Sequence, residues 1–203
     1  MKIFCIGRNY AEHARELGNA VPTEPIVFMK PPTALLLDGK PFYYPSFTND
    51  LHYEIEIVLR VSKSGRHIAP QFAHKYYDAV ALGIDFTARD WQNKLKAQGA
   101  PWEIAKGFDN SAVLGKFVPL NAFESLQNID FQLLKNKSVV QNGNTRDLIF
   151  SFDQIISYIS QFFTFQQGDV IYTGTPSGVG AVEIGDVLEG ILAGNSVLEC
   201  EIR

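Results

Sequence analysis

The chain has 203 residues, of which 46% are hydrophobic and 20% are charged, and its formal net charge is −4. This length and composition predict one compact domain over residues 1–203 with a sizeable core, and they argue against disorder. The acidic balance provides no basic surface for a phosphate backbone, so we expect no nucleic-acid partner.

Targeting and redox signals are weak. The N-terminus lacks the apolar stretch of a secretory signal, and no segment is apolar over membrane-spanning length. We therefore expect a cytoplasmic protein without a membrane partner. The two cysteines, Cys5 and Cys200, are too few for a disulfide framework or a cysteine metal cluster, and they are predicted to be buried thiols.

The first elements are a strand over residues 2–6, a helix over 10–17 closed by Gly18 and Asn19, and a strand over 26–29. His13 and Glu16 are three residues apart, so they share one face of this helix. Taken alone, such a pair is typical of an ordinary surface contact.

Residues 51–59 alternate strictly between apolar residues and a face that carries His52, Glu54, Glu56 and Val58, which is the period of a β-strand. Side chains two apart on a strand lie roughly 7 Å from each other, so Glu54 and Glu56 could share one divalent cation. The simpler interpretation is that they form the solvated face of a half-exposed strand.

A helix led by Pro70 is expected to run through Tyr77. The apolar residues 80–84 then predict a buried strand that ends in Asp85, whose carboxylate needs a partner or a metal. Thr87 is predicted to cap the next helix, with Asp90 in its first turn.

Lys106 lies in apolar company between Trp102 and Phe108, where it could either extend its amine to the surface or serve as a buried cation. Residues 129–140 predict a hairpin with its turn at Asn136 and Lys137. Ser151 is predicted to cap an amphipathic helix.

Six segments in order resemble the fumarylacetoacetate hydrolase family, in particular its short branch of acylpyruvate hydrolase and oxaloacetate decarboxylase-like enzymes. They are IGRNYAEHARE (6–16), EPIVFMKP (24–31), LHYEIE (51–56), DFTARD (85–90), PW with AK (101–102, 105–106) and TGTPSGVG (173–180). The resemblance implies an α+β fold, a β-rich mixed-sheet roll with a few peripheral helices, and a homodimer.

The resemblance also implies roles for individual residues. Glu54, Glu56 and Asp85 would bind a divalent ion, and His13 and Glu16 would form a water-activating pair on a mobile lid. Lys106 would be the cation beside the substrate. Substrate contacts are expected from Arg89, Gln92 and Thr175.

Three carboxylates form a hard, all-oxygen site that suits Mg²⁺ or Mn²⁺. The expected activity is hydrolysis of the C–C bond of acylpyruvates, with a small 2-oxo acid as substrate and with decarboxylation of oxaloacetate as a further reaction. The alternatives are a keto–enol tautomerase of oxaloacetate that uses the same chelate, or a non-enzymatic β-roll that holds Ca²⁺.

Two positions depart from the family pattern. Asn136 and Lys137 replace the common Asn-Gly turn, which would cost about 1 kcal/mol if Lys137 takes a positive φ. Gly107 follows the lysine where some relatives have serine, so a hydroxyl contact would be absent.

Overall fold

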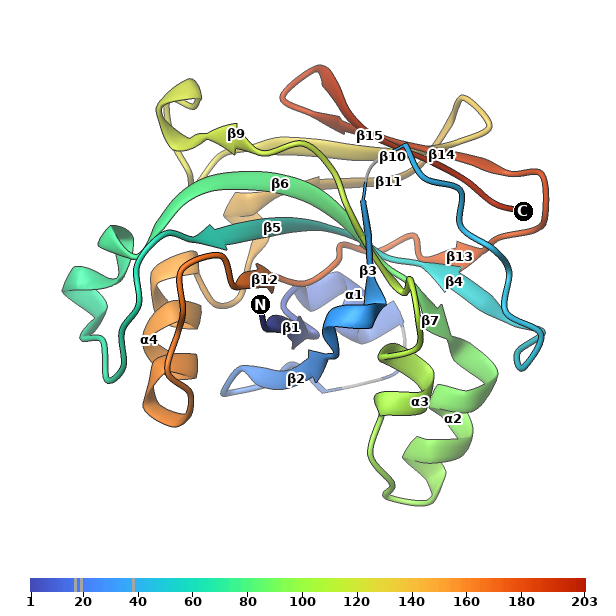
Figure 1. Cartoon of the computed structure of the whole chain (residues 1–203), viewed down its shortest axis with the longest axis horizontal. Coiled ribbons are helices and arrows are strands. Elements are labelled where there is room, and N and C mark those ends of the chain that lie inside the picture. Colours follow the sequence, from blue (N-terminus) through green and yellow to red (C-terminus); the bar gives the residue numbers. More distant parts are fainter. Residues whose placement is uncertain (17, 19, 38) are drawn as a thin grey trace.

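The computed structural model describes residues 1–16, 18, 20–37 and 39–203. Its largest unit is a mixed sheet of eight strands in the order β2-β1-β12-β5-β6-β8-β3, with β9 paired to β6. Strands β5 and β6 curve through the centre of the molecule, as Figure 1 shows. A four-stranded sheet, β11-β10-β14-β15, and a small sheet, β13-β4-β7, complete the β structure.

The strands are β1 Ile3–Gly7, β2 Ile26–Lys30, β3 Leu35–Leu37, β4 Leu51–Tyr53, β5 Ile55–Val61, β6 Tyr77–Asp85, β7 Thr87–Ala88, β8 Ala112–Leu114, β9 Val118–Pro119, β10 Asp130–Lys135, β11 Ser138–Asn144, β12 Val170–Tyr172, β13 Gly180–Ala181, β14 Val187–Leu192 and β15 Asn195–Glu201. The α-helices are α1 Ala11–Glu16, α2 Arg89–Ala97, α3 Glu103–Lys106 and α4 Phe152–Phe162. Short 3-10 turns occupy Pro32–Ala34, Pro70–Lys75, Leu120–Ala122 and Thr145–Asp147.

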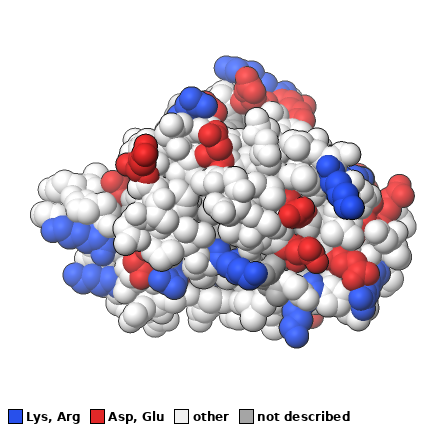
Figure 2. Space-filling model, turned by 90° about the horizontal axis from the view of Figure 1, so that it is seen from above, with Lys and Arg blue, Asp and Glu red and all other residues white. Residues whose placement is uncertain are grey.

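The four-stranded sheet lies across one side of β5 and β6, whereas α2, α3 and α4 lie at the periphery on the opposite side (Figure 1). The β-rich architecture with few helices agrees with the predicted α+β fold. No described helix is long and apolar enough to cross a membrane. On the face seen in Figure 2, basic and acidic side chains alternate without a continuous basic surface.

Several local predictions are confirmed. The hairpin of β10 and β11 turns at Asn136 and Lys137, which both have positive φ (52° and 69°), so the condition for strain at Lys137 is met. The Ser151 side chain accepts a hydrogen bond from the Gln154 amide at the start of α4, and the Gln154 side chain accepts one from the Ser151 amide. The strand that ends at Asp85 is β6.

The strand predicted over residues 51–59 is present but is divided into β4 and β5, and the interpretation of it as half-exposed is wrong. The ladder breaks at Glu54, and Ile55–Val61 is buried on both faces apart from the partly exposed Arg60. Ile57 packs into the main core, while Val58 on the other face packs into a second, smaller apolar cluster. That second cluster occupies the side that the alternation had assigned to solvent.

Two helix predictions are also wrong. The segment led by Pro70 forms a 3-10 turn that ends at Lys75, because Tyr77 already belongs to β6. Thr87 does not cap a helix, since it pairs with His52 in the small sheet and α2 begins two residues later. The expected end of the first helix at Leu17 and its closure at Asn19 lie outside the described residues.

Candidate metal and active site

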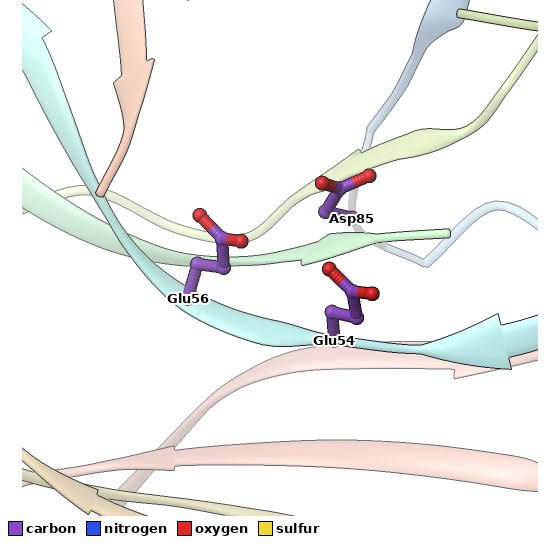
Figure 3. A group of neighbouring side chains, drawn as sticks. All are labelled: Glu54, Glu56 and Asp85. Carbon is purple, nitrogen blue, oxygen red and sulfur yellow. The ribbon is translucent and has the colours of Figure 1, made fainter. Parts of the chain in front are cut away.

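Three carboxylates meet where β5 and β6 pair. Glu54 lies in the break before β5, Glu56 is on β5, and Asp85 is the last residue of β6. The Asp85 amide donates to the Glu54 carbonyl at 2.9 Å, so the antiparallel register places the carboxylates beside each other. One oxygen from each carboxylate lies within 4.8 Å of the others, and Figure 3 shows the side chains directed toward a common space.

This group is almost fully removed from solvent, with exposed fractions of 5% for Glu54, 2% for Glu56 and 1% for Asp85. Burial of three like charges is costly unless cations or a metal ion compensate them. The interpretation of Glu54 and Glu56 as the solvated face of a strand is therefore wrong. Their position instead agrees with a cation-binding role.

Three basic side chains surround the carboxylates. Lys106 Nζ donates to Glu54 Oε2 and to Asp85 Oδ2, both at 2.8 Å, and Arg89 Nη2 donates to Glu54 Oε1 at 2.6 Å. Lys30 Nζ lies 2.7 Å from Asp85 Oδ1 as an ion pair whose angle falls outside hydrogen-bond geometry. Lys106 is buried, so it does not extend its amine to the surface.

The basic side chains compensate the charge of Glu54 much more than that of Glu56. Burial alone would raise the pKa of Glu54, but Lys106 and Arg89 more than offset this and hold that pKa well below its usual range. Burial, followed by the charges of Asp85 and Glu54, raises the pKa of Glu56 well above its ordinary value. Glu56 is thus the carboxylate of this group that a bound cation would stabilise most.

The donor set fits a hard divalent cation. Among the described residues only the Gly174 amide donates to Glu56, at 2.7 Å to Oε2, so the other carboxylate oxygen remains available. Carboxylate oxygens without thiolate or imidazole suit Mg²⁺ or Mn²⁺ better than Zn²⁺. A divalent ion between these oxygens would also relieve the repulsion that raises the Glu56 pKa.

His13 lies beside this group on α1. Its Nδ1 is 3.3 Å from Glu16 Oε2, and Glu16 in turn accepts from the Gly178 amide at 3.1 Å. His13 is buried and lines the same cavity as the three carboxylates, so its interpretation as a surface residue is wrong. Burial lowers the pKa of His13, although the charges of Glu54 and Glu16 partly oppose the shift.

The predicted substrate contacts also converge here. Arg89 Nη1 donates to Gln92 Oε1 at 2.6 Å, because the two residues are three apart on α2. Thr175 Oγ1 accepts from Gln141 Nε2 at 2.9 Å. Arg89, Gln92 and Thr175 all line the cavity, whose volume is about 30 Å³.

Three basic residues near the site were not among the predicted site residues. Lys30 ends the apolar run of β2 in the same way that Asp85 ends β6, which is the signal that could have identified it. Lys96 lies seven residues after Arg89, on the same helix face. Arg8 follows Gly7 in the first matching segment, and both Arg8 and Lys96 line the cavity.

Comparison with known proteins gives a consistent result. The family model "Fumarylacetoacetate (FAA) hydrolase C-terminal" matches residues 2–203. Oxaloacetate tautomerase FAHD1, mitochondrial, of Bos taurus is 41% identical over 95% of this chain and 87% of its own length. Oxaloacetate decarboxylase, mitochondrial, of Dictyostelium discoideum is 40% identical over 93% of this chain and 87% of its own length.

A crystal structure of fumarylpyruvate hydrolase from Pseudomonas aeruginosa, in complex with Mn²⁺ and pyruvate, superposes with a TM-score of 0.93. It is 37% identical and covers 100% of this chain and 89% of that one. These relatives are metal-using or oxaloacetate-related enzymes, and they agree with the predicted fold and with an acidic group that could bind a metal. This chain belongs to the fumarylacetoacetate hydrolase family.

Proposed function

We propose that this protein is a divalent-metal-dependent enzyme of small 2-oxo acids whose main reaction is the keto–enol tautomerisation of oxaloacetate. The proposal is supported above all by His13, which is buried and lines the same cavity as the three carboxylates. Because burial lowers the pKa of His13, its ring favours the neutral form that can accept a proton. The name of the bovine relative supports the choice of reaction.

Glu54, Glu56 and Asp85 would hold Mg²⁺ or Mn²⁺, which as a Lewis acid stabilises the enolate form of a 2-oxo acid. Arg89, Gln92 and Thr175 would orient the substrate. Because Arg89 and Gln92 are already hydrogen-bonded to each other, their side chains are held in place before substrate arrives.

His13 would move the proton. Its Nδ1 faces Glu16, which leaves Nε2 to remove a proton from C3 of oxaloacetate and to return it to the C2 oxygen. Glu16 would keep the ring oriented, and its contact with the Gly178 amide fixes the carboxylate in turn. Lys106 would stabilise the developing negative charge as a nearby cation.

Hydrolysis of acylpyruvates is the second candidate. The same His13 and Glu16 pair could activate a water molecule, and the crystallised relative is named a fumarylpyruvate hydrolase. Decarboxylation of oxaloacetate, after which another relative is named, would form an enolate at the same site without an attacking water. A non-enzymatic Ca²⁺ protein would have no need for the buried His13.

Replacement of His13 by Ala tests these roles. We expect tautomerisation to fall by ~10²-fold or more, the usual scale for a general base, while Mn²⁺ affinity measured by calorimetry stays unchanged. His74→Ala, at an exposed histidine, is the matched control. Wild-type protein that cleaves acetylpyruvate but does not interconvert the keto and enol forms of oxaloacetate would instead establish the hydrolase.

The pKa of His13 also sets a pH dependence. Since burial lowers this pKa below its ordinary value near 6.5, His13 is mostly neutral at pH 7 and can accept a proton. With saturating oxaloacetate, the rate is expected to be flat around neutrality and to fall only at lower pH, as His13 becomes protonated. A rate profile that instead declines from pH 7.5 downward would contradict this assignment.

Three further features remain predictions: a single domain over residues 1–203, a cytoplasmic location and a homodimer. The bovine and Dictyostelium relatives carry the word mitochondrial in their names, so the location of this protein needs its own measurement. Light scattering at micromolar concentration should give twice the mass of the 22.7 kDa chain. A monomeric mass would overturn the dimer prediction.

A further inference from the structure

Two basic side chains line the cavity without pairing to any carboxylate among the described residues. Arg8 and Lys96 are both half-buried, and among the described residues neither forms an ion pair. Arg89 and Lys106, the other cations of the cavity wall, are already paired with Glu54. Arg8 and Lys96 are therefore the two basic side chains of the cavity wall that could bind an anionic ligand.

The backbone at Arg8 has a strained conformation, and it is fixed by the hydrogen bonds of the next residue, Asn9. Asn9 is fully buried, and its side chain donates to the Thr173 carbonyl at 2.8 Å and accepts from the Phe150 amide at 2.8 Å. Arg8, just before this anchor, has a φ of 60°, a left-handed conformation that is uncommon for a residue with a side chain. Such strained positions often occur at ligand sites.

Lys96 lines the cavity from α2. It follows Gln92 by four residues on α2, and Arg89, Gln92 and Lys96 all line the cavity. Its Nζ lies 5.5 Å from the centre of the Trp102 ring. Burial and then the positive charges of Arg8 and Arg89 lower the pKa of Lys96 to about 8, so these cations are close enough to repel.

The balance of charge indicates what the cavity would accept. Its lining has four basic side chains, Arg8, Arg89, Lys96 and Lys106, against three carboxylates, and a divalent ion would add further positive charge. A 2-oxo acid with one carboxylate leaves much of that excess uncompensated. A second carboxylate at Arg8 and Lys96 would reduce their repulsion and form charge-assisted hydrogen bonds.

We infer that Arg8 and Lys96 form a subsite for the second carboxylate of a dicarboxylic 2-oxo acid, and so select dicarboxylic over monocarboxylic substrates. The inference rests on the proposed function, because it assumes that the first carboxylate and the keto oxygen face the carboxylate triad. Oxaloacetate belongs to the selected class, whereas acetylpyruvate does not.

Two stable ligands test the subsite without turnover. N-Oxalylglycine carries an oxamate head and a distal carboxylate, and N-ethyloxamate replaces that carboxylate by a methyl group. Their dissociation constants would be measured by calorimetry with Mn²⁺-loaded protein. We expect wild-type protein to bind the dianion at least about tenfold more tightly, the scale of one charge-assisted hydrogen bond.

The variants Lys96→Met and Arg8→Gln should each lower this preference about three- to tenfold without weakening N-ethyloxamate. Lys96→Arg should restore it, because the charge returns. Lys94→Met is the matched control, since Lys94 is exposed on the same helix and does not line the cavity. A merely structural role for Arg8 and Lys96 would weaken both ligands equally.

The two proposals fail in different ways. Equal affinity of wild-type protein for both ligands, or equal losses for both in the variants, would overturn the subsite while leaving the chelate intact. Absence of Mn²⁺-dependent binding of either ligand would overturn the proposed function together with the subsite that rests on it. A preference for the dianion that only the Arg8 and Lys96 variants reduce would support both.

Discussion

The two ends of the β5–β6 pair carry ion pairs of opposite character. At one end Arg60 Nε donates to Asp78 Oδ1 at 2.8 Å, and the two side chains are 41% and 48% exposed. At the other end Lys30 and Asp85 lie 2.7 Å apart, with 0% and 1% of their side chains exposed. The distances are similar, but the surroundings differ completely.

The length of an ion pair alone does not determine how much it contributes to stability. Water solvates Arg60 and Asp78 whether or not they are paired, so their contact contributes little to stability. At the buried end each charge depends on its neighbours for solvation, so the loss of one partner leaves another uncompensated. A charged cluster of this kind is weak evidence for a stabilising role and stronger evidence for a functional one.

The largest expected effect comes from the buried end. Lys30→Met keeps most of the side-chain volume but leaves Asp85 without its partner on Oδ1. We expect the metal-free protein to lose about 3–5 kcal/mol of unfolding free energy, measured by urea denaturation. A loss below 1 kcal/mol would mean that the buried pair behaves like an exposed one.

Glu56→Gln should separate stability from metal binding. The variant keeps the shape of a proposed ligand but removes its charge, so Mn²⁺ affinity should fall at least ~100-fold by calorimetry. The metal-free variant should nevertheless be more stable than wild type at pH 7, because the repelled carboxylate is gone. Unchanged Mn²⁺ affinity would remove Glu56 from the metal site.

The same residue gives a pH test. Since the folded pKa of Glu56 is raised, the folded state retains its proton longer than the unfolded state does. The stability contributed by protonated Glu56 is fully present below the unfolded value near 4.3, and it is lost as pH rises toward the raised folded pKa. The Glu56→Gln variant should lack this part of the pH dependence of the urea midpoint.

A smaller change in unfolding free energy is expected at the turn between β10 and β11, which belongs to neither end of the β5–β6 pair. Lys137 has a φ of 69°, so Lys137→Gly should relieve strain and stabilise the protein by about 1 kcal/mol. Enzymatic activity should not change. A destabilised Lys137→Gly protein would show that the side chain contributes more than its backbone costs.

The smallest effect is expected at the exposed end. Arg60→Met should change the unfolding free energy by less than about 1 kcal/mol, and added salt should reduce the difference further. Part of any residual loss would come from Phe117, whose ring centre lies 5.1 Å from the Arg60 guanidinium. Asp78→Asn serves as the control, because it removes the ion pair and leaves that ring contact in place.

Local sequence was sufficient for elements whose signals lie within a few residues. The capping side chain of Ser151, the turn at Asn136 and Lys137, and the buried strand ending at Asp85 were all predicted correctly. In each case the backbone conformation depends on neighbouring residues. The resemblance of six short segments added the family and the candidate site residues, which periodicity alone could not supply.

Tertiary structure decided where the charges lie. The alternation over residues 51–59 could not show that its second face is covered, because the cluster against Val58 comes from Cys5, Ala112 and Tyr172, which are distant along the chain. The burial of His13 likewise depends on packing between distant segments. Periodicity reports the local geometry of one strand or helix, whereas burial, and with it the pKa and ion pairing of these side chains, depends on which distant segments pack against it.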